Sequence, residues 1–269
     1  MRLPPTSAPT RVTRLPFVWI ALLSAVLWAG LALAAWQGWL GTPEGRGGGF
    51  CEASRAGLMR QPVNTLSNLG FTVAALAIAW RASLPGTGAD ARQRTGVLAF
   101  AVVVALLGPG SAAMHATETA LGGHLDLLSM YLLASFAAAW ALVRSGRLTP
   151  SRGAWVFAAF VVACEVVGAL PVSLPVIMHP GNAAFALLLL VTVALETQMV
   201  LRAGAEWRWG VAALATLLLA FAIWNLAKDG SPWCAPTSPV QGHGLWHLLD
   251  ALAAYFLARH YLTPGPSAG

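Results

Sequence analysis

Eight long apolar runs, separated by polar connectors, constrain the fold of this chain more than any other feature. They lie at about Pro16–Gly38, Val63–Trp80, Gly96–His115, Gly123–Val143, Gly153–Val172, Gly181–Leu201, Trp209–Ala227 and Val240–Leu262. A transmembrane helix needs about 20 mostly apolar residues. Only 10% of the 269 residues are charged, whereas soluble domains carry about 25%. The sequence therefore predicts an all-α polytopic membrane protein with eight spanning helices.

The first apolar run allows two interpretations. Ala32-Leu33-Ala34 resembles a small-residue cleavage site, which is typical of a secretory signal peptide. The run is long for a signal peptide, however, and it contains Trp19 and Trp28. We therefore expect a retained helix, and either interpretation leaves the remaining topology unchanged.

The distribution of Lys and Arg predicts the orientation in the membrane. With the N-terminus inside, the inner segments hold twelve of the sixteen basic residues, and the outer segments hold four. The inner set is Arg2, Arg11, Arg14, Arg81, Arg92, Arg94, Arg144, Arg147, Arg152, Arg202, Arg208 and Arg259, and the outer set is Arg46, Arg55, Arg60 and Lys228. Cytoplasmic loops are enriched in Lys and Arg, so we expect both termini in the cytoplasm. The net charge of +6 then reflects topology and gives no reason to expect a nucleic-acid partner.

Polar side chains gather at the outer ends of three predicted helices. Ser111 and His115 end the third run, Asp126 lies near the start of the fourth, and His243 and His247 open the eighth. Residues four apart share one face of a helix. Because the orientation was derived from basic residues alone, the common depth of these five side chains independently supports one shared site.

Each part of this group also has a less specific interpretation. The histidine pair suits two ligands of one zinc ion, or it consists of interfacial side chains that face water. The Ser–His pair follows Gly108-Pro109-Gly110, which we expect to break or kink the helix. Such a kink lines a wet cavity or is only a packing feature. Asp126 is either a functional carboxylate within a span or an interfacial residue in headgroup water.

The remaining polar residues are weaker candidates for a functional role. Asp250, one turn past His247, is a candidate support for that histidine. Glu165 and Glu196 are expected to pair inside the bundle, and the connector Leu40–Pro62, with its three consecutive glycines, is expected to be mobile. Solvated loop or interface positions are expected for His124, His179 and His260.

Together these segments resemble a known family. The likeness rests on Gly108-Pro-Gly-Ser111-Ala-Ala-Met-His115, then Asp126, then His243-Gly-Leu-Trp-His247. Asn64-Thr-Leu-Ser-Asn68 and Trp224-Asn225, followed by Asp229 and Cys234, add to it. The pattern, from about Phe50 to Leu262, resembles the alkaline ceramidases of the CREST superfamily of seven-helix membrane hydrolases. The family has seven helices, so the first helix here is an addition to that pattern. We therefore expect an extra N-terminal transmembrane helix (1–40), an outer loop (41–62), a seven-transmembrane-helix catalytic core (63–262) and a cytoplasmic tail (263–269).

The resemblance also implies a site and a reaction. His115, His243 and His247 would hold Zn²⁺, while Ser111 and Asp126 would flank the water that attacks the substrate. The substrate would be a ceramide-like N-acyl lipid that enters from the outer leaflet and is cleaved to a fatty acid and an amine base. Cys51 would pair with Cys234 on the outer face, leaving Cys164 free. Of the family's calcium site only Glu52 clearly remains, which gives calcium binding little support.

The alternative to a hydrolase is a receptor-like or structural seven-helix protein with a non-catalytic zinc site. Structural zinc sites have four protein ligands, whereas catalytic sites keep an open position. Three histidines with a separate carboxylate favour the open site. Asp126 as a fourth ligand would favour the alternative.

Overall fold

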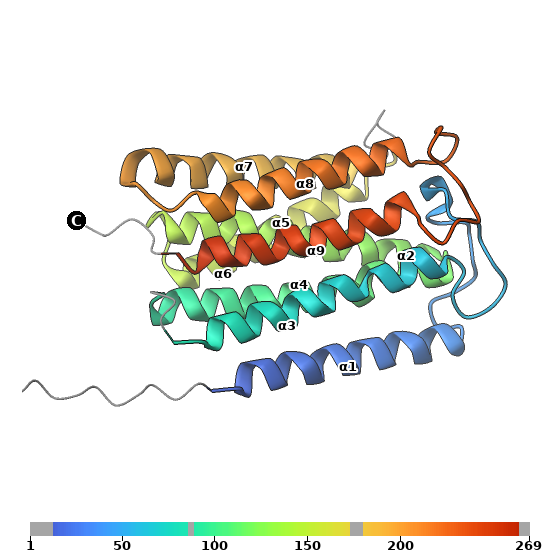
Figure 1. Ribbon diagram of the computed structural model, residues 1–269, viewed down its shortest axis with the longest axis horizontal. Coiled ribbons are helices and arrows are strands. Elements are labelled where there is room, and N and C mark those ends of the chain that lie inside the picture. The colour runs from blue at the N-terminus through green and yellow to red at the C-terminus, as the bar shows by residue number, and fades with distance from the viewer. Residues whose placement is uncertain (1–12, 86–88, 173–179, 264–269) are drawn as a thin grey trace, which may run out of the picture.

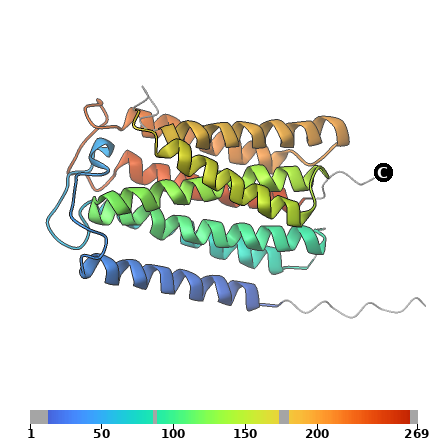
Figure 2. The ribbon, with the colours of Figure 1, turned by 180° about the vertical axis from the view of Figure 1, so that it is seen from behind.

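The computed structural model describes residues 13–85, 89–172 and 180–263, which form a bundle of helices without a sheet. The elements are α1 (Leu15–Trp36), α2 (Pro62–Ser67), α3 (Leu69–Ser83), α4 (Ala91–Thr117), α5 (Ala120–Arg144), α6 (Pro150–Gly168), α7 (Pro180–Ala203), α8 (Arg208–Leu226) and α9 (Gly242–Tyr261). A 3₁₀ turn covers Gly48–Phe50. The long helices lie side by side along one axis (Figures 1 and 2). The expected all-α architecture is confirmed.

Seven helical segments in the described ranges are long and apolar enough to cross a membrane. They are α1, α2 with α3, α4, α5, α6, α7 and α8. The expected eighth span coincides with α9, which has 20 residues but is not among the seven. His243, His247 and Asp250 lower its hydropathy. Because α9 packs against α8, α3 and α2, much of its polar face is enclosed by protein. The protein is therefore a multi-pass membrane protein.

Local sequence signals explain where several helices begin. Asp90 accepts a hydrogen bond from the Gln93 backbone N–H, and the Gln93 side chain accepts one from the Asp90 backbone. This reciprocal pair is a capping box, which satisfies two otherwise unpaired donors of α4. Thr119 caps α5 in a similar way through Gly122. These two caps define the residues at which α4 and α5 begin.

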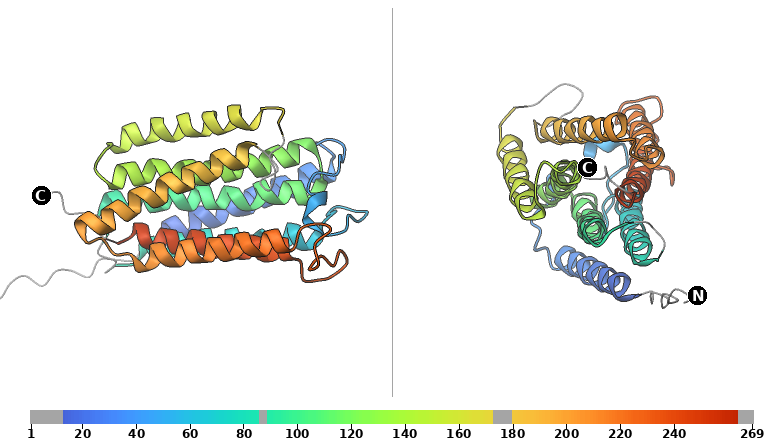
Figure 3. Two further views of the ribbon diagram at one scale, coloured as in Figure 1. Left: turned by 90° about the horizontal axis from the view of Figure 1, so that it is seen from above. Right: turned by 90° about the vertical axis from the view of Figure 1, so that its left-hand side faces the viewer.

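The centre of the bundle is α4, whereas α1 lies at its edge. Most of the membrane-length part of α4 is buried, and very little of α1 is. Figure 3 shows α1 outside the other helices when the bundle is viewed along its axis. Its contacts with α3 and α4 include a hydrogen bond from Trp28 Nε1 to Thr72 Oγ1 (2.8 Å). Alanines fill much of the α3–α4–α9 contact, as in Ala75, Ala101 and Ala254, because small side chains let membrane helices approach closely.

The chain does not break at Pro109. Pro109 lies inside α4, which continues to Thr117. Its neighbouring glycines serve close packing instead. A Cβ at Gly108 would lie 2.9 Å from the Asn68 carbonyl oxygen, and one at Gly110 would lie 2.8 Å from the Ser129 Cβ. The glycines therefore let α3 and α5 approach α4 beside the candidate site.

The connector 40–62, for which mobility was expected, is anchored at several points. A disulfide joins Cys51 to Cys234, as the family resemblance implied, and Cys164 is free and buried. Arg60 forms an ion pair with the buried Glu118 at 2.6 Å. Both carboxylate oxygens of Glu52 accept backbone N–H bonds from Val63 and Asn64 at the start of α2. A carboxylate is favoured at a helix N-terminus, so Glu52 has a structural partner without calcium.

The two ends of the bundle differ in chemistry. The end that holds His115, His243 and His247 is called the histidine end and lies at the right in Figure 1. The opposite end holds Arg81, Arg94, Arg144, Arg202, Arg208 and Arg259 near helix termini and is called the arginine end.

Candidate metal centre

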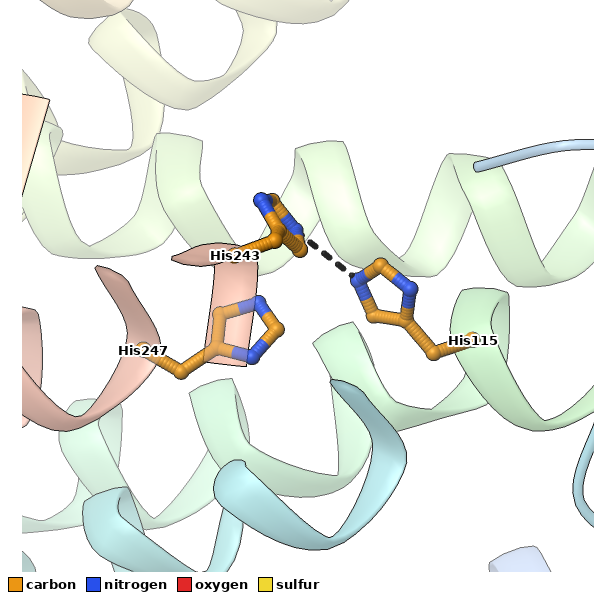
Figure 4. A group of neighbouring side chains, drawn as sticks. All are labelled: His115, His243 and His247. Carbon is orange, nitrogen blue, oxygen red and sulfur yellow. Dashed lines mark hydrogen bonds between the residues drawn. The ribbon is translucent and has the colours of Figure 1, made fainter. Parts of the chain in front are cut away.

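Three histidines from two distant parts of the chain converge at the histidine end. His115 lies in the last turn of α4, and His243 and His247 lie in the first two turns of α9. All three are buried, and one ligand nitrogen from each lies within 4.8 Å of the others. Figure 4 shows the three rings turned toward a common point. The cluster can hold a metal ion.

The spacing of the nitrogens suits a tetrahedral metal. His115 Nε2 lies 3.1 Å from His243 Nε2. Two nitrogens bound to one zinc at about 2.0–2.1 Å with tetrahedral angles would be separated by about 3.3 Å. The observed distance is close to this value. No Cys, Asp or Glu in the described ranges joins the cluster, so the donor set consists of three neutral imidazoles.

Gln61 determines which nitrogen of His115 is available to a metal. Its side-chain Nε2 donates to the Gly47 and Glu52 carbonyl oxygens at 3.0 and 3.4 Å, which fixes the orientation of the amide. Its Oε1 then faces His115 Nδ1 at 2.7 Å. An amide oxygen only accepts hydrogen bonds, so His115 Nδ1 carries the proton. The lone pair of His115 is consequently on Nε2, the nitrogen that faces His243.

Ser67 supports His247 in the same way. The Ser67 hydroxyl donates to the Asn64 carbonyl oxygen at 3.0 Å and lies 2.8 Å from His247 Nδ1. A hydroxyl has one hydrogen, so Ser67 accepts the N–H of His247. The Asn68 amide lies 3.3 Å from the same nitrogen and donates one of its two hydrogens to the Asn64 carbonyl at 2.8 Å, and the Asn64 backbone is also a hydrogen-bond partner of the His247 ring. His247 therefore also keeps its Nε2 lone pair free.

The third histidine is supported by an aromatic ring. Phe50 stacks on His243 with the ring centroids 3.9 Å apart and the planes 7° apart. His243 Nδ1 is buried and has no hydrogen-bond partner among the described residues. The orientation of this imidazole therefore depends on stacking, and on Cys51, which anchors the loop next to Phe50.

Ser111 and Asp126 lie together beside the histidines. Ser111 is buried one turn before His115 on α4, and its hydroxyl interacts with the Asp126 carboxyl group of α5. Asp126 is partly accessible, and its oxygens are not part of the histidine cluster. The three predicted metal ligands therefore converge, and Ser111 joins Asp126 to the turn of α4 that precedes His115. The Asp126 carboxylate is not a fourth member of the histidine cluster.

The structure confirms some of the expectations for the remaining polar residues and contradicts one of them. Glu196 is paired as expected, with Arg144 and His260, and Glu165 lies 3.7 Å from a half-exposed His124. The assignment of His260 was wrong, because its side chain is buried in the Glu196 network.

Two further assignments are not supported by contacts. Asp250 Oδ1 has no hydrogen-bond partner among the described residues, so no contact with His247 supports the expected role. His179 lies outside the described residues.

Sequence reasoning missed the supporting roles of Gln61, Ser67 and Phe50. The run Asn64-Thr-Leu-Ser-Asn68 was a partial signal, since four polar side chains open an otherwise apolar segment. No local pattern connects Phe50 with a histidine 193 positions later. Only the folded loop brings the two rings into contact.

Comparison with protein families gives an independent assignment. No curated protein matches the chain in a direct sequence comparison. The family model described as Ceramidase matches residues 58–263, a range that contains all three histidines, Ser111 and Asp126 and covers more than half of the chain. The chain therefore belongs to the ceramidase family.

Proposed function

We propose that this protein is a zinc-dependent membrane amidohydrolase that cleaves ceramide-like N-acyl lipids to a fatty acid and an amine base. Family membership supports a ceramide-hydrolysing membrane enzyme. The observation that carries the zinc-dependent mechanism is the buried cluster of three histidines beside a Ser111–Asp126 pair that is not part of it. Three nitrogen ligands with an open fourth position are typical of catalytic zinc.

In this proposal His115, His243 and His247 hold the zinc ion through their Nε2 atoms. When bound, zinc supplies a Lewis acid that polarises an amide carbonyl and lowers the pKa of a water molecule to about 7. Gln61 and Ser67 keep two of the imidazoles in the tautomer that leaves Nε2 unprotonated. Such supporting hydrogen bonds orient metal ligands and raise their basicity.

Asp126 is the proposed general base. Its carboxylate oxygen would accept a proton from the attacking water and later deliver it to the leaving amine nitrogen, so that the residue is regenerated in each cycle. Ser111 interacts with this carboxyl group and keeps it in place. Once Asp126 has taken the proton, its carboxyl group can donate to the Ser111 oxygen, and the single Ser111 hydrogen is then available to the developing oxyanion, an interaction often worth about 3 kcal/mol.

The membrane supplies the substrate in this proposal. The arginine distribution supports cytoplasmic termini and a histidine end at the outer face, as the positive-inside tendency expects. Phe50 stacks on one face of the His243 ring, and the Cys51–Cys234 disulfide anchors the loop that carries it. Because this loop covers the site from the end of the bundle, a long-chain lipid would enter between helices from the outer leaflet.

The direct test is product analysis with purified protein. We expect a fatty acid and an amine base from ceramides in a panel of N-acyl lipids, detected by mass spectrometry. Activity should disappear after removal of metal and return with zinc. Stoichiometric zinc without turnover of any lipid in the panel would instead support a structural or receptor-like role for the site.

A further inference from the structure

A small cavity lies at the arginine end, at the ends of three helices. Its volume is about 130 Å³, and it is lined by Arg81, Trp209, Arg259, Leu262 and Thr263. Arg81 is in the last turn of α3 and Arg259 in the last turn of α9, while Trp209 is in the first turn of α8. These helix ends lie at the left of the bundle in Figure 1, opposite the histidines.

The two arginines lack acidic partners in the described ranges. The acids described at this end have other contacts. Glu196 lies against Arg144 and His260, Glu206 lies 4.0 Å from Arg208, and Asp90 caps α4. Arg81 and Arg259 are both only partly exposed. A partly buried charge gains from a nearby counter-charge, so an anion in this cavity would be stabilised by both guanidinium groups.

The arrangement of Arg259 leaves donors free for such an anion. Its Cζ lies 3.9 Å from the centroid of the Trp209 ring, and its Nη1 donates to the Tyr255 hydroxyl at 3.3 Å. Stacking on an aromatic ring restrains the guanidinium and uses none of its five N–H donors. The guanidinium of Arg81 makes no hydrogen bond with any described residue.

We propose that this cavity binds a phosphate group, carried either by an anionic phospholipid or by a free phosphate ion. Guanidinium groups match phosphate oxygens with paired hydrogen bonds. Basic pockets between transmembrane helices are known sites for phospholipid headgroups. A tryptophan at a helix end is typical of the membrane interface, where such headgroups lie. The site is at the opposite end from the histidines and does not depend on the proposed hydrolase activity.

The test compares two probes on purified protein in detergent. Native mass spectrometry with phosphatidylglycerol and phosphatidylcholine measures headgroup preference, and the melting temperature in phosphate against chloride at equal ionic strength measures free phosphate. The wild type should prefer phosphatidylglycerol by about tenfold or more if the source is lipid. A phosphate-dependent rise in melting temperature, without lipid preference, would identify the free ion as the ligand.

Three variants make the result specific. Arg81→Gln combined with Arg259→Gln should abolish both responses, whereas the double lysine variant should retain part of them because it keeps the charge. Arg208→Gln, at an 80% exposed side chain of the same end, should behave as wild type. The proposal is overturned if the double glutamine variant binds as well as wild type, or if Arg208→Gln causes an equal loss.

Discussion

At the histidine end, three imidazoles lie within 4.8 Å of one another without a carboxylate among them. At the arginine end, Glu196 lies 3.3 Å from Arg144 and 2.8 Å from His260, and the Arg144 and His260 side chains are each 2% exposed. Both clusters are buried and both join distant helices. Only the second contains charges of opposite sign.

The difference indicates where each cluster obtains its stability. The Glu196 cluster at the arginine end holds its own counter-charges, because Glu196 lies against both Arg144 and His260. At the histidine end, the neutral groups Gln61 Oε1 and Ser67 Oγ accept hydrogen bonds from the histidine rings. The free nitrogen lone pairs of these rings suit a metal cation, which supplies the missing positive charge. The following variants test this contrast.

The largest effect is expected for His247→Ala. Zinc should fall from about one ion per chain to a small fraction, because two protein ligands rarely hold zinc tightly, and hydrolysis should be lost with it. Elemental analysis after dialysis against a chelator measures the metal. His124→Ala, at an exposed histidine of α5, serves as the control. Full zinc retention in His247→Ala would mean that the ligand assignment is wrong.

Asp126→Asn should lower turnover by about 10²–10⁴-fold, the usual contribution of a general acid–base group. The change preserves shape but removes basicity, so zinc content and melting temperature should stay near wild type. Ser111→Ala should also keep zinc, with a smaller loss of turnover. A joint loss of zinc and thermal stability in Asp126→Asn would show that the carboxylate is a ligand of a structural site.

Glu196→Gln should destabilise the protein by about 3–5 kcal/mol, because it leaves the buried Arg144 without its carboxylate. Zinc affinity should not change, since the histidines lie at the other end of the bundle. Thermal unfolding in detergent measures the first effect and a chelator titration the second. Glu165→Gln, whose side chain is 32% exposed, is the matched control. If Glu196→Gln weakened zinc binding and left the melting temperature unchanged, the two clusters would not differ in this way.

The smallest of these effects is expected for Gln61→Leu. Loss of a hydrogen bond to a metal-ligating histidine typically costs about 10–100-fold in metal affinity. Gln61→Glu keeps an acceptor for His115 Nδ1 and should retain most of the affinity. Competition with a zinc chelator measures both variants. Equal affinity of Gln61→Leu and wild type would show that Gln61 does not set the tautomer.

The sequence predicted the helices and the convergence of the site well, for a clear physical reason. Membrane-length apolar runs permit few alternatives to a helix, and the four-residue spacings put Ser111 with His115, and His243 with His247, on shared faces. Because both pairs were expected at the same depth in the membrane, the sequence also predicted that they would lie close together. The Cys51–Cys234 bond was expected only from the family resemblance.

The remaining errors concern contacts between segments far apart in the chain. Gly108-Pro109-Gly110 has the composition of a helix break, but α4 continues through it and the two glycines let Asn68 and Ser129 approach closely. The glycine-rich connector resembles a mobile loop, yet Arg60 and Glu52 hold it through partners that no local pattern reveals. His260 resembles an interfacial residue until Glu196 is placed beside it.

The disulfide between Cys51 and Cys234, which are 183 positions apart, encloses α2 through α8 in one covalent ring. Of the α-helices that the structure describes, α1 precedes this ring and α9 follows it. A single protease cut in any connector inside the ring would therefore leave the two fragments joined. They would migrate as one species on a non-reducing gel and separate only after reduction, so the bundle would remain one molecule after its chain had been broken.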